Sequence, residues 1–102
     1  MEEAILILYS RKGCCLCEKL EERLNILPLK NINPPLKLKV VDIDSGELTE
    51  AERSRYNLEV PVLKIIFNQG KGQLILPRVS PRMGGDQLAL WLQRSLEKLN
   101  LV

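Results

Sequence analysis

The stretch Gly13-Cys14-Cys15-Leu16-Cys17 contains all three cysteines of the chain and separates an apolar segment from a charged one. Cys14 and Cys17 form a Cys-x-x-Cys pair, whose spacing brings two thiols onto adjacent parts of the first turn of a helix. This spacing serves either a disulfide that opens and closes or one half of a metal site. The rest of the sequence must decide between these two functions.

The segments on either side of the cysteines predict a strand followed by a helix. Residues 4–9 form a continuous apolar run, which is typical of a strand that is covered on both faces. After a break at residues 10–13, leucines recur at helical spacing as far as Pro28, where the predicted helix ends. These leucines are Leu16, Leu20, Leu24 and Leu27. A Cys-x-x-Cys pair at such a strand-to-helix turn is typical of thiol redox motifs.

The remaining sequence predicts two further helices and three further strands. Thr49 and Glu52 have the spacing of a capping box, which predicts a short helix that runs to about Tyr56 and stops at Asn57. The last helix is predicted to follow Gly84-Gly85-Asp86, with an apolar stripe of Leu88, Trp91 or Leu92, Leu96 and Leu99. The strands are predicted over residues 36–43, 62–67 and 73–76, with turns or loops over residues 31–35, 44–46, 68–72 and 77–81.

The predicted order of elements is β-α-β-α-β-β-α. Turn formers join the last two strands, most simply as an antiparallel hairpin. Each of the first two helices can instead connect parallel strands in a right-handed crossover. The predicted fold class is therefore α/β, with a central four-stranded mixed sheet that carries helices on both faces. A chain of 102 residues is expected to form one domain over residues 1–102.

The composition narrows the classes of partner. The 15 basic and 13 acidic residues are interspersed and leave a net charge of +2, without the basic stripe that nucleic-acid binding usually needs. No apolar run reaches the roughly 18 residues that cross a membrane. The acidic start Met1-Glu2-Glu3 and the short apolar run after it do not resemble a signal peptide. We therefore expect a cytoplasmic monomer that binds neither nucleic acid nor membrane.

The chain contains no histidine. This excludes histidine-ligated zinc sites and cysteine hydrolases that depend on a histidine base. A strong zinc signal would contain a second cysteine pair, so a complete four-ligand site would need an outside thiol or a second chain. No metal ligands are therefore assigned, although a metal or iron–sulfur carrier remains an alternative.

The two thiols of the pair are expected to differ. Cys14 would begin the helix, where free backbone N–H groups and the helix dipole favour a thiolate, and Arg11 and Lys12 add positive charge. Cys17 shares a side of the helix with apolar residues and should be shielded, as a resolving thiol requires. Cys15 is a spacer, a third metal ligand, or a site of glutathionylation or intermolecular bonding.

Three motifs in order support a family resemblance. The segment Leu8-Tyr9-Ser10-Arg11-Lys12-Gly13-Cys14-Cys15-Leu16-Cys17 resembles the active site of glutaredoxin-like proteins of the thioredoxin superfamily, in particular a branch with Cys-x-Leu-Cys. Val60-Pro61 and Gly84-Gly85-Asp86 follow at the expected places. The resemblance implies a thioredoxin-like fold in which Cys14 is the nucleophile and Cys17 the resolving thiol. It also implies that the Val60–Pro61 bond is cis and faces the cysteines.

The resemblance further implies substrate contacts. The backbone of Val60, before Pro61, would pair with a bound peptide or glutathione. Lys12 would meet a glutathione carboxylate, and Gly85 with Asp86 would bind its other end at a helix N-terminus. The chain departs from the Cys-Pro-Tyr-Cys that is typical of glutaredoxins. In addition, an acidic residue, Glu59, lies near the implied groove.

The implied function is that of a thiol–disulfide oxidoreductase without a bound cofactor and with glutathione as a candidate co-substrate. Its partners would be a disulfide-bearing protein or glutathione, and a reductase or glutathione would donate the electrons. A metal or iron–sulfur carrier and a non-catalytic interaction module remain alternatives.

Overall fold

The computed structural model describes residues 4–32, 35–67, 70, 72–76 and 83–98. Within these residues the elements follow the predicted order, with one short 3-10 turn added. The elements in chain order are β1 (Ala4–Ser10), α1 (Cys15–Ile26), η1 (Leu29–Asn31), β2 (Leu36–Asp42), α2 (Glu50–Tyr56), β3 (Val62–Phe67), β4 (Gly72–Ile75) and α3 (Gly85–Lys98).

The four strands form one mixed sheet in the order β2-β1-β3-β4. β1 pairs with β2 in parallel and with β3 antiparallel, and β4 runs antiparallel to β3. β1 is therefore a central strand, which explains why its sequence is apolar without alternation. The α/β class and the four-stranded mixed sheet are as predicted, and they correspond to a thioredoxin-like fold.

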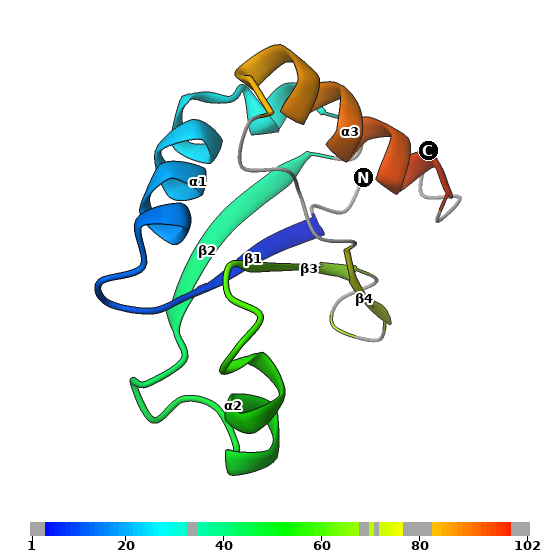
Figure 1. Ribbon diagram of the computed structural model, residues 1–102. Coiled ribbons are helices and arrows are strands. Elements are labelled where there is room, and N and C mark those ends of the chain that lie inside the picture. The colour runs from blue at the N-terminus through cyan, green and yellow to red at the C-terminus, as the bar shows by residue number, and fades with distance from the viewer. Residues whose placement is uncertain (1–3, 33–34, 68–69, 71, 77–82, 99–102) are drawn as a thin grey trace.

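Helices cover both faces of the sheet, and a cluster of buried side chains fills each interface (Figure 1). α1 and α3 lie on one face, where Leu24 and Leu92 are fully buried. α2 lies on the other face, where Tyr56 packs with Tyr9. Alternate residues of β1 enter the two clusters: Leu6 and Leu8 enter the first, and Ile7 and Tyr9 the second.

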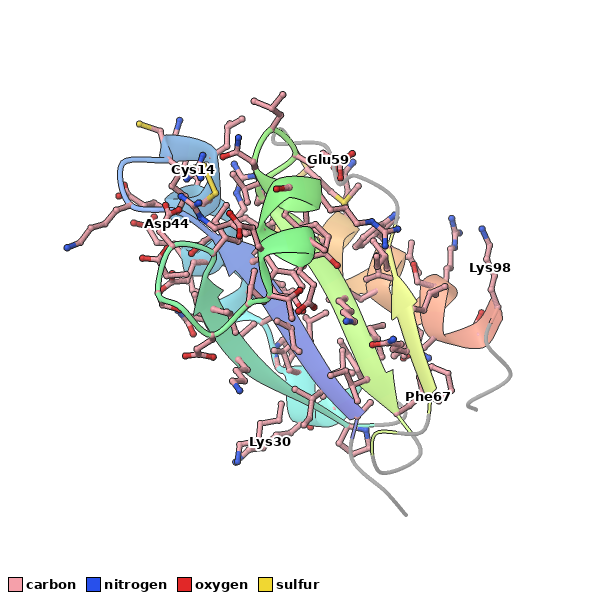
Figure 2. The ribbon with its side chains drawn as sticks, turned by 90° about the horizontal axis from the view of Figure 1, so that it is seen from below. Cys14, Lys30, Asp44, Glu59, Phe67 and Lys98 are labelled. Atoms are coloured by element: carbon pink, nitrogen blue, oxygen red, sulfur yellow. A yellow bond between two sulfur atoms is a disulfide. The ribbon has the colours of Figure 1, made fainter. Side chains whose placement is uncertain are left out.

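Among the described residues, α2 covers the second face at one end only, because it has just seven residues, Glu50–Tyr56. Figure 2 shows α2 over the end of the strands that carries Cys14 and Asp44, whereas Phe67 lies at the opposite end. Ile5, which shares this face with the buried Tyr56 cluster, is consequently exposed. The short helix thus stands beside the end of the sheet from which the cysteine loop leaves.

Local details both match and modify the predictions. The capping box of Thr49 and Glu52 is present, with the Glu52 amide donating to the Thr49 hydroxyl at 3.2 Å. The loop predicted over residues 31–35 starts at the last residue of η1, and Ile32 within it is buried in the first cluster, as is Leu29 before it. The predicted loop over residues 77–81 and the predicted stripe residue Leu99 lie outside the described residues. No helix in the described ranges has the length and apolar character needed to cross a membrane.

Candidate redox site

The loop between β1 and α1 positions Cys14 at the N-terminus of the helix. Gly13 has a φ of +80°, in the left-handed region that favours glycine, and the Cys14 amide donates to the Arg11 carbonyl at 3.2 Å. Cys14 is the N-cap of α1, and its Sγ accepts a hydrogen bond from the backbone N–H of Cys17 at 3.2 Å. The predicted location of Cys14 is confirmed, because its sulfur takes up one of the free N–H groups of the first turn.

Cys14 and Cys17 form a disulfide, with their Cα atoms 5.2 Å apart. Figure 2 shows this S–S bond beside Cys14 at one end of the molecule. Cys17 is only 1% exposed, whereas Cys14 is half-buried. The predicted shielding of Cys17 is therefore confirmed, and an outside thiol or disulfide reaches Cys14 more readily. A cysteine pair at disulfide distance fits a redox-type function.

Cys15 begins α1 and is an exposed free cysteine. It takes no part in the disulfide, which joins the other two cysteines, Cys14 and Cys17. The geometry assigns it none of the three roles considered from the sequence, so these roles stay predictions.

The Val60–Pro61 bond is cis, as the resemblance implied. Val62 pairs with Tyr9 in the sheet, so this bond lies beside the end of β1 that leads into the cysteine loop. Pro61 is buried and Val60 is half-buried. The N–H of Val60 already donates to the Tyr56 carbonyl at 3.2 Å. A backbone contact between Val60 and a substrate, which stays a prediction, would therefore use its carbonyl unless that bond opens.

Arg11 joins the cysteine loop to two other loops at this end of the sheet. Its guanidinium binds the Asp44 carboxylate through Nε at 2.9 Å and Nη2 at 3.2 Å, and it donates to the Asn57 carbonyl at 3.2 Å and to the Asn57 side chain. Arg53 of α2 also binds Asp44, at 2.9 Å. Hydrogen bonds from Arg11 and Arg53 lower the pKa of Asp44, and the bond to Asp44 raises the pKa of Arg11. Of the two positive charges expected to act on Cys14, that of Arg11 is thus engaged by Asp44, whereas Lys12 is exposed.

The other predicted binding residues lie in two separate places. Lys12 is exposed in the loop directly before Cys14. Gly85 lies next to Leu27, whose side chain would be 3.9 Å from a Cβ added at Gly85. Leu27 caps the end of α1 opposite to Cys14, about 20 Å along the helix axis.

The structure therefore does not bring Gly85 and Asp86 together with Cys14. Contact between glutathione and either Gly85 or Asp86 stays a prediction. Both residues are exposed at the start of α3.

Two stacked tyrosines lie in the buried cluster between α2 and the sheet, next to the redox site. The rings of Tyr9 and Tyr56 stack with their centroids 4.6 Å apart, and Lys64 Nζ lies 6.0 Å from the centroid of the Tyr9 ring. Burial, with smaller contributions from Tyr56 and Glu52, raises the pKa of Tyr9 to about 12. The stack packs α2 against β1. It therefore also fixes the position of the turn after α2, because the N–H groups of Glu59 and Val60 in that turn donate to the Tyr56 carbonyl.

The described ranges contain no group of three or more Cys, His, Asp or Glu residues that could hold a metal ion. The cysteine pair thus has no nearby acidic or thiol ligand set within the part of the chain that the structure describes. This finding lends no support to the metal-carrier alternative.

Comparison with known proteins agrees with the observed fold and shows the family of the chain. Residues 5–93 match the model of a family described as a glutaredoxin-like domain (DUF836). The chain is similar to the X-ray structure of a structural genomics target protein, XcR50, from X. campestris, with 29% identity over 87% of this chain and 96% of that one, at a TM-score of 0.51. It shares the fold of a malarial protein at a TM-score of 0.61, with 18% identity over 93% and 99% of the two chains. No curated protein matches the chain.

Sequence reasoning did not find the partners of Arg11, although a signal for one of them was present. Arg11 directly follows β1, and Asp44 follows β2. Since the carboxyl ends of parallel neighbouring strands meet at one edge of a sheet, these two residues had to lie close together. The contact with Asn57 depends on where α2 ends relative to the cysteine loop, and no local pattern encodes that position.

Proposed function

We propose that this chain, which belongs to the glutaredoxin-like family, is a thiol–disulfide oxidoreductase that reduces disulfides through Cys14 and Cys17. The single observation that supports this proposal best is the asymmetric pair: a half-buried Cys14 at the helix N-cap is at disulfide distance from a fully shielded Cys17. Exchange requires one thiol that substrates can reach and a second thiol that can resolve the product.

The reaction begins with the reduced protein. The Cys14 thiolate attacks one sulfur of a substrate disulfide; a Cys14–substrate S–S bond forms, the substrate S–S bond breaks, and the departing thiolate takes up a proton. The Cys17 thiolate then attacks Cys14 Sγ, which forms the Cys14–Cys17 disulfide and releases the second substrate thiol. Two electrons pass from the protein to the substrate. Two equivalents of a thiol such as glutathione, or a reductase, return them.

The chain's own residues assist each step. The N–H of Cys17 and the positive end of α1 stabilise negative charge on Cys14 Sγ, both when it attacks and when it leaves. The burial of Cys17 keeps substrates and oxidants from attacking the wrong sulfur. We propose Lys12, exposed beside the pair, and Val60 with Pro61 as contacts for the substrate. The substrate is a disulfide-bearing peptide or protein, or glutathione disulfide.

Three variants test this assignment in a peptide-disulfide reduction assay with a thiol donor. Cys14→Ser, made together with Cys15→Ser, is expected to abolish reduction, because the exposed thiol of Cys15 is then also absent and no accessible nucleophile remains. Cys17→Ser is expected to accumulate a mixed disulfide between Cys14 and the peptide, which mass spectrometry detects. Cys15→Ser is the matched control and should retain the reduction rate of the wild-type protein. Reduction at the wild-type rate by the protein with both Cys14→Ser and Cys15→Ser would rule out the proposed function.

A further inference from the structure

The turn between α2 and β3 carries the most exposed of the large apolar side chains that the structure describes. Leu58 is 89% exposed, and its neighbour Glu59 is exposed as well. A second apolar side chain, that of Leu16 within the cysteine motif, is 41% exposed. A single exposed leucine is common on protein surfaces. Leu58 is of interest for substrate binding because it lies at the same end of the sheet as the redox pair.

The turn that carries Leu58 is held from both sides rather than free. The amides of Glu59 and Val60 both donate to the Tyr56 carbonyl, at 3.0 and 3.2 Å, which closes the turn after α2. Asn57, directly before Leu58, accepts two hydrogen bonds from Arg11, at its carbonyl and at its side-chain oxygen. The exposed leucine is thus presented from a fixed backbone.

Arg11 also connects this turn to the redox pair. The Arg11 carbonyl accepts the hydrogen bond from the Cys14 amide, while its guanidinium holds Asn57. The Asp44 carboxylate also fixes the guanidinium, because its two oxygens accept hydrogen bonds from Nε and Nη2 of Arg11. Figure 2 shows Cys14, Asp44 and Glu59 at the same end of the strands. One side chain therefore sets the position of Leu58 relative to Cys14.

The charges next to Leu58 favour an apolar substrate segment over an anionic one, whereas the exposed cation Lys12 lies in the cysteine loop. The guanidinium of Arg11 is engaged by Asp44, and the carboxylate of Glu59 is exposed next to Leu58. Glutathione carries two carboxylates, one ammonium group and no apolar side chain, so it gains little from Leu58, and its net negative charge is unfavourable next to Glu59. A peptide with a large apolar residue near its cysteine would instead gain by covering Leu58.

From these contacts we infer that Leu58 is a specificity-determining contact for protein disulfides whose attacked cysteine has a large apolar neighbour. Arg11 is the positioning residue that holds the turn of Leu58 at the end of the sheet that carries Cys14. This inference rests on the proposed function and adds the substrate class to it.

The test compares two synthetic peptides, each with one internal disulfide, which differ only in a leucine or a serine beside the attacked cysteine. All proteins carry Cys15→Ser, and the rate constant for exchange with the reduced protein is measured by mass spectrometry of quenched samples. When Leu58 is present, the leucine peptide should react about tenfold faster than the serine peptide, which is a typical effect of burying one apolar side chain. Leu58→Ser should lower that rate to the rate of the serine peptide.

Arg11→Met should also reduce the preference for the leucine peptide. The double variant with Leu58→Ser and Arg11→Met should show no further loss of this preference, because both residues act through one contact. Alkylation of Cys14 by iodoacetamide, measured in parallel, reports the reactivity of the thiol without peptide contact. Ile26→Ser is the matched control, since Ile26 is 83% exposed at the far end of α1. It should keep the full preference.

Equal rates of the wild-type protein on the two peptides would overturn the inference and leave the proposed function standing. So would a loss in Ile26→Ser as large as that in Leu58→Ser. If Arg11→Met slows alkylation as much as peptide exchange, Arg11 acts on the thiol and its positioning role is wrong. Failure to reduce either peptide would overturn the proposed function itself, and the inference with it.

Discussion

Reduction of the Cys14–Cys17 disulfide should change the stability of the fold only modestly. The bond closes a loop with a sequence separation of only 3, and chain-entropy arguments give a stabilisation of about 2 kcal/mol for so short a loop. Reduction restores a thiolate at the N-terminus of α1, which offsets about 0.3–1 kcal/mol of that loss. Neither buried cluster contains Cys14 or Cys17, so both cores remain intact.

The expected net loss is therefore about 1–2 kcal/mol, out of the roughly 5–15 kcal/mol that is typical of small domains. It corresponds to a melting temperature lower by roughly 4–16 °C. Guanidinium unfolding of the oxidised and reduced Cys15→Ser protein, followed by circular dichroism, measures the difference. A reduced chain that is unfolded, or less stable by more than about 4 kcal/mol, would make the disulfide a structural staple and refute the reasoning.

Two other features of the fold lead to further predictions. Leu24→Ala should cost about 2–5 kcal/mol in chemical unfolding, because Leu24 is fully buried between α1 and the sheet, whereas Ile26→Ala on the exposed side should cost less than about 0.5 kcal/mol; similar losses would contradict the packing. The pKa of Tyr9 is raised to about 12 in the folded chain, whereas tyrosine ordinarily titrates near pH ~10. As the pH rises, Tyr9 therefore loses its proton at a lower pH in the unfolded chain than in the folded chain. This contribution to stability is complete below about pH 10 and is lost as the pH rises to about 12. Phenolate absorbance of a Tyr56→Phe protein, in which Tyr9 is the remaining tyrosine, that rises near pH ~10 without unfolding would show that Tyr9 is not buried.

The fold could be predicted largely from local patterns. The unbroken apolar run of residues 4–9 indicated a central strand, and it is central because β2 and β3 flank it. The capping box at Thr49 fixed the start of α2 through side-chain chemistry that is local in sequence. The turn η1 was not predicted, because the burial of Leu29 depends on packing against distant elements rather than on its neighbours.

The site was predictable where a motif specifies its own geometry. A Cys-x-x-Cys pair at a helix start puts one sulfur at the N-cap and the other inside the first turn. The exposures of Cys14 and Cys17 followed from this spacing and from the apolar side of the helix that Cys17 shares. The distance between Gly85 and Cys14 depends instead on how α3 crosses α1, which no motif encodes. The role of Arg11 likewise arises from three loops that meet only in the folded chain.

The most direct test of the redox assignment is a redox titration of the purified protein, with mass spectrometry to report which thiols are oxidised at each potential. The account predicts one reversible two-electron transition, confined to Cys14 and Cys17, at a potential between about −120 and −270 mV, the range of dithiol oxidoreductases. A pair that cannot be reduced reversibly, or whose potential lies below about −300 mV as in structural disulfides, would contradict it.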